Sequence, residues 1–145
     1  MFIGKMIEEN IEQIMFLERE TFSDPWTEAA FYTAINNPLY ESIIAQEGEQ
    51  VVGYLIYSYI PPEGEIQRIA VRTGFQKRGI GTALMENIVL FSKEQEVTAI
   101  TLEVRAGNRA ARNLYEHCGF VKEGVRKGYY QGPQEDAVIM WNRRI

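Results

Sequence analysis

The residues best suited to chemistry lie in a glycine-rich turn between an apolar run and an amphipathic segment. The run 66–71 has strand character, and from Ile80 onward apolar residues recur at helical spacing. The turn between them contains three glycines and two cations: Gly74, Lys77, Arg78, Gly79 and Gly81. Free amides at a helix start bind phosphate oxygens, so the pattern predicts a phosphate or pyrophosphate site, with a plain tight turn as the alternative.

Two common phosphate motifs do not fit this turn. Gly74 and Gly79 have the spacing of a nucleotide P-loop, but Ile80 replaces its lysine and Gly81 replaces its Ser or Thr. The three-glycine dinucleotide fingerprint is also absent. These mismatches disfavour a GTPase, an ATPase and a dinucleotide enzyme. The pattern that remains is Gln76, two residues, Gly79, one residue and Gly81.

Two side chains downstream could carry acid–base chemistry. Glu103 lies on the polar face of an expected strand, where a carboxylate can accept a proton or simply be solvated. Tyr115 lies on the inner stripe of an expected helix with Ala111, Leu114 and Cys118, where a phenol can donate a proton or simply pack. Residue type and periodicity alone leave both alternatives open at each position.

Composition excludes several classes of protein. The 145 residues are 46% hydrophobic, which suits one ordinary globular domain, and the net charge of −5 disfavours a nucleic-acid binder. No apolar run approaches the roughly 20 residues of a membrane span, and the acidic start does not resemble a signal peptide. Cys118 is the only cysteine, so no intrachain disulfide is possible and a cytoplasmic location is expected.

A metal site and a cysteine nucleophile are both disfavoured. His117 is the only histidine, so no Cys and His cluster can form, and no metal is expected. His117 and Cys118 are neighbours, but adjacent helical residues point about 100° apart. Cys118 continues the Leu114 face, and we therefore expect a core cysteine and a surface histidine.

The whole pattern predicts a mixed α/β domain. Between the first two expected helices, Ser23, Asp24 and Thr27 suit helix capping, and Trp26 suits either a core anchor or a groove wall. Asn108 is a plausible N-cap, and Gly119 a plausible helix end. The expected strands are 1–7, 39–46, 50–60, 66–71, 97–105, 120–130 and 135–141, and the expected helices are 8–21, 27–36, a segment from 80 and a segment from 108 to 118.

The glycine turn resembles the pyrophosphate loop of the Gcn5-related N-acetyltransferases. Over essentially the whole chain the sequence is similar to one branch of that superfamily, the RimI-like ribosomal-protein alanine N-acetyltransferases. The resemblance implies a single α/β domain over 1–145, with a mixed, mostly antiparallel sheet of about seven strands and about four helices. The residues that carry it are Gln76, Gly79 and Gly81, then Leu102–Asn108, Ala111, Leu114, Tyr115, Gly119, Phe120, Arg126, Tyr129, Tyr130, Glu135–Ala137 and Met140.

The resemblance also implies a site for acetyl-CoA as co-substrate, with no metal. Glu103 would be the general base and Tyr115 the general acid, and the amide-rich pantetheine arm would lie along the backbone of residues 69–71. Trp26, Tyr129 and Tyr130 would line the acceptor groove, although two tyrosines before a turn also suit strand packing. The implied cofactor-binding residues are Ile69, Ala70, Val71, Gln76, Lys77, Arg78, Gly79, Ile80, Gly81, Thr82, Asn108 and Tyr115.

The expected reaction is acetyl transfer to the N-terminal α-amine of a protein, the N-terminal alanine of a small-subunit ribosomal protein in the branch that the chain resembles. An α-amine has a reference pKa of about 7.7–8.0, so a far larger fraction is neutral at pH 7 than of a lysine near 10.4. The alternatives are acetylation of a small free amine and a non-catalytic acetyl-CoA-binding module. A monomer is favoured, without direct nucleic-acid or membrane contact.

Two residues depart from the pattern of this branch. Gly107 occupies a position that usually holds serine and could loosen the turn before Asn108. Arg68 occupies a strand position that usually holds a small or amide residue and could alter contacts with the acceptor. Both departures bear on the substrate more than on the fold.

Overall fold

The computed structural model describes all residues, 1–145, as one seven-stranded sheet with four α-helices. The expected α/β architecture is therefore confirmed. The strands are β1 (Phe2–Lys5), β2 (Tyr40–Glu47), β3 (Gln50–Ile60), β4 (Glu63–Val71), β5 (Ala99–Arg105), β6 (Val121–Tyr130) and β7 (Glu135–Asn142). The helices are α1 (Ile11–Thr21), which follows a 3₁₀ turn at Glu8–Asn10, α2 (Glu28–Asn36), α3 (Ile80–Glu94) and α4 (Arg109–His117). No helix combines the length and apolar character that crossing a membrane requires.

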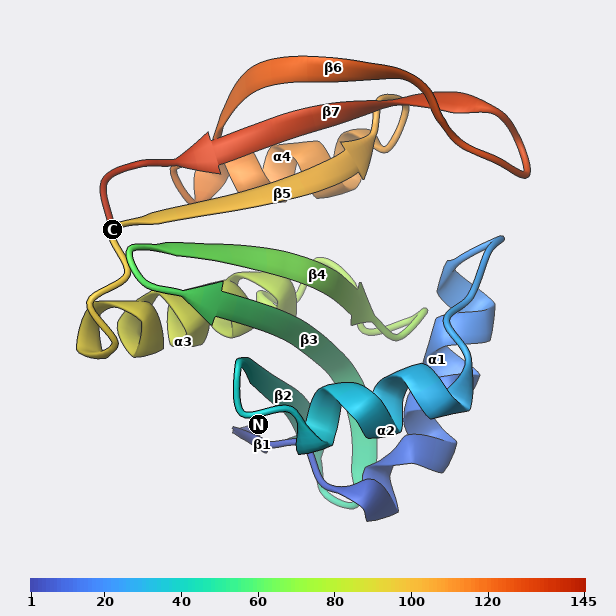
Figure 1. The fold of residues 1–145 in the computed structure, drawn as a ribbon. Coiled ribbons are helices and arrows are strands. Elements are labelled where there is room, and N and C mark those ends of the chain that lie inside the picture. The colour runs from blue at the N-terminus through green and yellow to red at the C-terminus, as the bar shows by residue number, and fades with distance from the viewer.

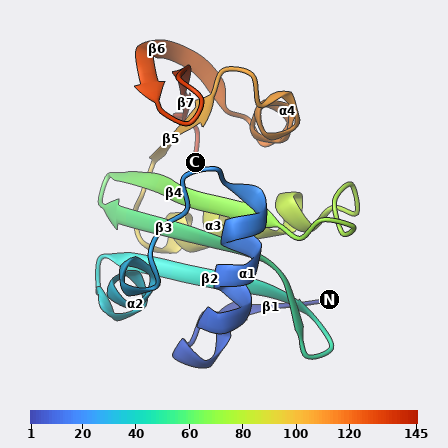
Figure 2. The ribbon, with the colours of Figure 1, turned by 90° about the vertical axis from the view of Figure 1, so that its right-hand side faces the viewer.

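Helices cover both faces of the sheet, whose strand order is β1-β2-β3-β4-β5-β7-β6 (Figures 1 and 2). Helices α1 and α2 pack on one face, and α3 packs on the other. Strand β3 is buried on both faces because its apolar residues alternate between two cores: Val52, Leu55 and Tyr57 face α3, whereas Val51, Tyr54 and Ile56 face α1. This double burial explains the nearly continuous apolar run of β3.

Three helix ends follow the expected local chemistry. Thr27 caps α2 by accepting the Ala30 N–H at 3.2 Å, so neither Ser23 nor Asp24 serves as this cap. Asn108 caps α4 by accepting the Ala111 N–H at 3.1 Å. Gly119 follows α4 with φ of +92°, a conformation that favours glycine.

Strands β4 and β5 form the one parallel pair, and they separate halfway along. Their ladder joins Glu63–Ile66 to Ala99–Leu102 and ends there. The register between β3 and β4 shifts at the same point, because Ile56 pairs with Arg68 while Tyr57 pairs with Ile66, leaving Gln67 as a bulge. Beyond Ile66 the β4 edge is open towards β5, and Figure 2 shows the β5–β7 layer with α4 standing apart from the rest.

Candidate active site

The opening between β4 and β5 holds a cavity of about 1130 Å³. Its lining includes all the sequence-predicted site residues except Arg78, whose guanidinium lies 4.9 Å from the ring centroid of Phe75. The predicted residues that line it are Trp26, Ile69, Ala70, Val71, Gln76, Lys77, Gly79, Ile80, Gly81, Thr82, Glu103, Asn108, Tyr115, Tyr129 and Tyr130. The fold thus gathers residues from segments far apart in the sequence around one space.

The glycine turn presents a row of free backbone donors to this cavity. No backbone N–H from Gln76 to Thr82 donates a hydrogen bond within the chain, and the ladder of α3 begins after them. Gly79, the N-cap position, has φ of +81°, and Lys77 has φ of +62°, so the turn depends on left-handed residues. Free donors at the positive end of a 15-residue helix form an anion site suited to a diphosphate.

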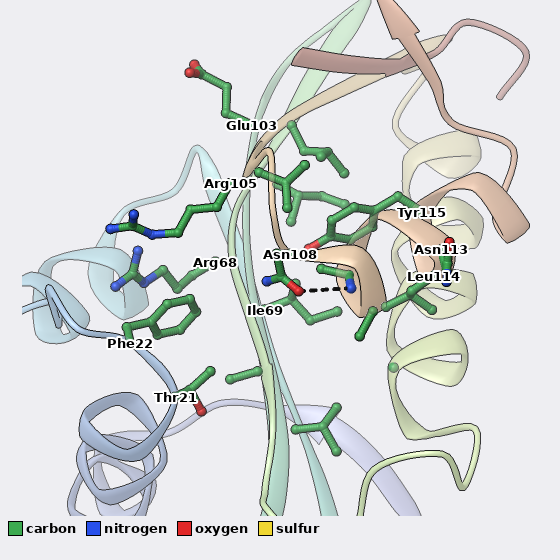
Figure 3. A pocket seen from close by; sticks show the side chains of 18 of the residues that line it. Thr21, Phe22, Arg68, Ile69, Glu103, Arg105, Asn108, Asn113, Leu114 and Tyr115 are labelled. Atoms are coloured by element: carbon green, nitrogen blue, oxygen red, sulfur yellow. Dashed lines mark hydrogen bonds between the residues drawn. The ribbon is translucent and has the colours of Figure 1, made fainter. Parts of the chain in front are cut away.

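Asn108 and Tyr115 lie on the same side of the opening as Ile69 and Leu114 (Figure 3). The Asn108 Oδ1 atom is occupied as the helix cap, while its Nδ2 group has no partner in the chain. The Tyr115 ring is buried at 6% exposure and packs against Phe120 with centroids 6.2 Å apart. Burial raises the pKa of the Tyr115 hydroxyl well above its usual value, and the nearby Tyr130 and Cys118 raise it further. This phenol therefore stays protonated at neutral pH.

Glu103 points to the opposite side of the opening, where Arg68 and Arg105 also lie (Figure 3). Its Oε2 atom is shielded from solvent and has no well-aligned hydrogen bond, although the Nε atom of Arg126 lies at 3.2 Å. Burial is the main cause that raises the pKa of Tyr130 to about 12, and the negative charge of Glu103 is the next largest cause. Glu103 is thus a carboxylate with spare hydrogen-bonding capacity facing the cavity.

One wall of the cavity on the Glu103 side is the turn between α1 and α2. Trp26 is half-buried, with its ring centroid 5.3 Å from that of Phe31 while it also lines the cavity, so it serves as both core anchor and wall. Arg68 holds the turn through a hydrogen bond of 3.0 Å to the Asp24 carbonyl and an ion pair with Glu18. Glu18 was not among the site residues predicted from the sequence. The sequence feature that could have indicated it is a carboxylate at position 18 within the apolar helical stripe at 11, 14, 15 and 22.

The opposite wall is the β6–β7 turn, and Arg105 holds it. The guanidinium donates to the Gln131 carbonyl at 2.6 Å and the Pro133 carbonyl at 2.8 Å, and pairs with Glu135 at 3.3 Å. Glu135 also accepts the Gly107 N–H at 2.5 Å, and a Cβ at position 107 would meet that carboxylate at 2.6 Å. The glycine at position 107 therefore permits this close hydrogen bond to Glu135, which fixes the turn before Asn108.

His117 and Cys118 lie in different surroundings, as the expected surface histidine and core cysteine. His117 is exposed at the cavity rim, and Cys118 is half-buried against the core with its thiol pKa raised by burial. No three side chains of His, Cys, Asp or Glu come together as metal ligands. The side chains that line the cavity include carboxamides, carboxylates, phenols and cations.

The fold and cavity define an α/β protein with a two-sided ligand site between separated parallel strands, one side rich in amide donors and the other in charged side chains. The model of the acetyltransferase (GNAT) family matches residues 11–120 of the chain. The protein belongs to this family, and its fold is the one expected from the sequence resemblance.

Similar proteins cover nearly the whole chain. N-alpha-acetyltransferase RimI of Mycobacterium tuberculosis is 34% identical over 95% of this chain and 89% of its own length. The ribosomal protein bS18-alanine N-acetyltransferase of Salmonella typhimurium is 32% identical over 86% of this chain and 84% of its own. The crystal structure of the Escherichia coli ribosomal-protein-S18-alanine N-acetyltransferase superposes with a TM-score of 0.89 at 28% identity, over 97% of this chain and 91% of that one.

Proposed function

We propose that this protein transfers acetyl from acetyl-CoA to the N-terminal α-amine of a protein, and that its substrate is the N-terminal alanine of ribosomal protein bS18. The named activity of relatives at 32–34% identity supports the acceptor. The observation that carries the proposal is the two-sided cavity, in which free amides face one side of the opened strand pair and a carboxylate faces the other.

The residues around the cavity fit acetyl-CoA. The unpaired amides from Gln76 to Thr82 suit its diphosphate, and Lys77 adds a positive charge beside them. The open β4 edge at Ile69–Val71 and the free Nδ2 group of Asn108 suit an amide-rich arm, which can pair with a strand as another strand would. When bound, acetyl-CoA supplies a thioester, an acetyl group activated for attack by an amine.

Glu103 is assigned the role of general base. An acceptor ammonium has no lone pair and must lose a proton before its nitrogen can attack a carbonyl. The carboxylate lies on the acceptor side of the opening, where it can take that proton directly or through one water. The guanidinium of Arg126 lies beside the carboxylate, with its Nε atom 3.2 Å from the Glu103 Oε2 atom.

Tyr115 is assigned the role of donor to the leaving sulfur. Its raised pKa keeps the hydroxyl protonated, and the ring lies on the side assigned to the thioester. A thiolate with a reference pKa near 8.5 is a weaker base than a tyrosinate near 10. Tyr115 therefore acts mainly by hydrogen bonding to the developing negative charge.

Mass spectrometry of paired peptides tests the proposal. A peptide with the first residues of bS18 and a free N-terminal alanine should gain one acetyl group at that amine in the presence of acetyl-CoA and the protein. The same peptide with a blocked N-terminus should react far less. Equal modification of both peptides would refute selectivity for α-amines, whereas modification of small amines alone would favour the free-amine activity.

A further inference from the structure

Glu18 is a completely buried carboxylate that anchors an arginine beside the acceptor side of the cavity. It is 0% exposed, and both oxygens have hydrogen-bond partners: Oε1 accepts the Tyr54 hydroxyl, and Oε2 accepts the Trp26 N–H at 2.8 Å and the Arg68 Nε–H at 2.9 Å. A buried charge is tolerated when it is paired and hydrogen-bonded in this way. Glu18 is enclosed and out of reach of a ligand, so what it offers the cavity is a fixed Arg68.

Arg68 is held rigidly but is not saturated. Its Nε and Nη2 groups donate to Glu18, Nη2 also donates to the Asp24 carbonyl at 3.0 Å, and the guanidinium carbon lies 3.7 Å from the Phe22 ring centroid. A guanidinium has five N–H donors, and the two on Nη1 have no partner in the chain. With 16% of the side chain exposed, these donors border the cavity.

The β4 bulge determines where those donors lie. Because Gln67 is the extra residue, Ile66 faces the α3 core while Arg68, the partner of Ile56, faces the α1 side. Arg68 directly precedes Ile69, the first residue assigned to the pantetheine arm, and shares the acceptor side with Glu103 and Arg105 (Figure 3). Its charge also acts across the cavity to lower the pKa of Tyr130, which burial raises.

An α-amine differs from other amines in the group next to it. In a peptide N-terminus the carbonyl of the first residue lies two bonds from the nitrogen, whereas a lysine ε-amine has only methylene groups at that distance. A charged donor fixed beside the reacting amine can recognise this carbonyl oxygen in every peptide, whatever its side chains.

We propose that Arg68 is the residue that selects α-amines, by donating its Nη1 hydrogens to the first carbonyl oxygen of the acceptor. The acceptor amine then lies between Glu103 and the thioester, and Glu18 serves as the positioning residue that keeps the guanidinium in place. The inference rests on the proposed function, since it specifies how that site recognises its substrate.

A double-mutant cycle between enzyme and substrate tests this contact. The acceptors are a peptide with a free N-terminal alanine and its analogue in which an uncharged E-alkene replaces the first peptide bond. With the wild type, kcat/KM should fall about tenfold or more on removal of the carbonyl, and Arg68→Met, which leaves no donor, should cause a similar loss with the normal peptide. With the alkene analogue, Arg68→Met should have little further effect. If the losses of transition-state free energy from the enzyme substitution and from the carbonyl removal are additive, the proposal is overturned.

Controls separate a lost contact from a damaged fold. Arg143→Asn removes an arginine that pairs with Glu123 at the surface and should leave all rates unchanged. Glu18→Gln combined with Arg68→Met removes both charges of the pair together, and this double variant should repeat the result if the single variant misfolds. Calorimetry with CoA should give the same affinity for every folded variant. A wild type that acetylates neither acceptor while binding CoA would refute the proposed function instead.

Discussion

The two sides of the cavity present different parts of the chain to the two proposed substrates, acetyl-CoA and the acceptor peptide. The side formed by the turn before α3 offers main-chain N–H groups, from Gln76 to Thr82. The acceptor side is built from charged side chains in three ion pairs: Glu18 with Arg68, Glu103 with Arg126, and Glu135 with Arg105. Main-chain recognition depends on backbone angles, so most side chains there can change freely. On the acceptor side each substitution alters a contact. Differences in acceptor specificity between related proteins are therefore expected on that side.

The largest effect is expected at Glu103. Replacement by Gln keeps the shape of the side chain but removes its ability to accept a proton, so kcat/KM for the peptide should fall by about 10²-fold or more. Calorimetry should find unchanged CoA affinity, because the loss belongs to the acceptor side alone. Glu123→Gln, which removes a surface carboxylate paired with Arg143, is the matched control. An unchanged kcat/KM for Glu103→Gln would remove this residue as the base.

Tyr115 should give the next largest effect. Tyr115→Phe removes one hydroxyl and should lower kcat by about 10- to 100-fold with little change in either KM. The raised pKa also predicts a pH profile: the protonated phenol persists as pH rises, so wild-type kcat should not decline on the alkaline side below about pH 10. A decline centred near pH 8 would assign the donor role to another group.

Gly79 tests the side that depends on the main chain. At φ of +81° a β-branched residue is strained by about 1–2 kcal/mol, so Gly79→Val should weaken CoA binding by about 5- to 30-fold while the peptide KM stays unchanged. Gly48→Val introduces a similar strain at φ of +60° in the β2–β3 turn, where no heavy atom lies within 4 Å of the new Cβ. This control should lose stability without losing CoA affinity. Equal losses of CoA affinity would contradict an assigned role for the 76–82 turn.

Lys77 should give the smallest effect, and it distinguishes side-chain charge from main-chain amides on the α3 side most directly. Lys77→Ala keeps the backbone amide and the same positive φ but deletes the charge. Exposed charges contribute little in water, so the KM for acetyl-CoA should rise by no more than about threefold, and less at high salt. A tenfold rise would mean that side-chain charge dominates this side too.

Most of the fold was predictable because its signals are local. The glycine turn, the Asn108 cap, the Gly119 helix end and the apolar faces of α3 and α4 depend on residues close together in sequence. The observed strand boundaries differ from the expected ones where pairing with a neighbouring strand sets them. Strand β4 begins at Glu63, three residues before the expected 66, because Glu63 pairs with Ile60 across a two-residue turn.

The acceptor side was the less predictable part of the site. Glu18 and Arg68 are 50 residues apart, and neither alone suggests a partner. Glu135 was part of the sequence resemblance, but its contacts with Arg105 and Gly107 depend on the pairing of β5 with β7. Long-range pairs of this kind leave no periodic trace in a single sequence.

The sequence by itself determined the α/β architecture and the free-amide turn, because residue types and short spacings encode these features. The resemblance to the acetyltransferases singled out Glu103 and Tyr115 as candidate acid–base groups, which spacing alone left open. Only the tertiary structure decided that β4 separates from β5 after Ile66, that the bulge at Gln67 turns Arg68 towards α1, and that Glu18 holds it there. Register, bulges and buried pairs arise from packing between distant segments, and this packing determines which side of the cavity each side chain faces.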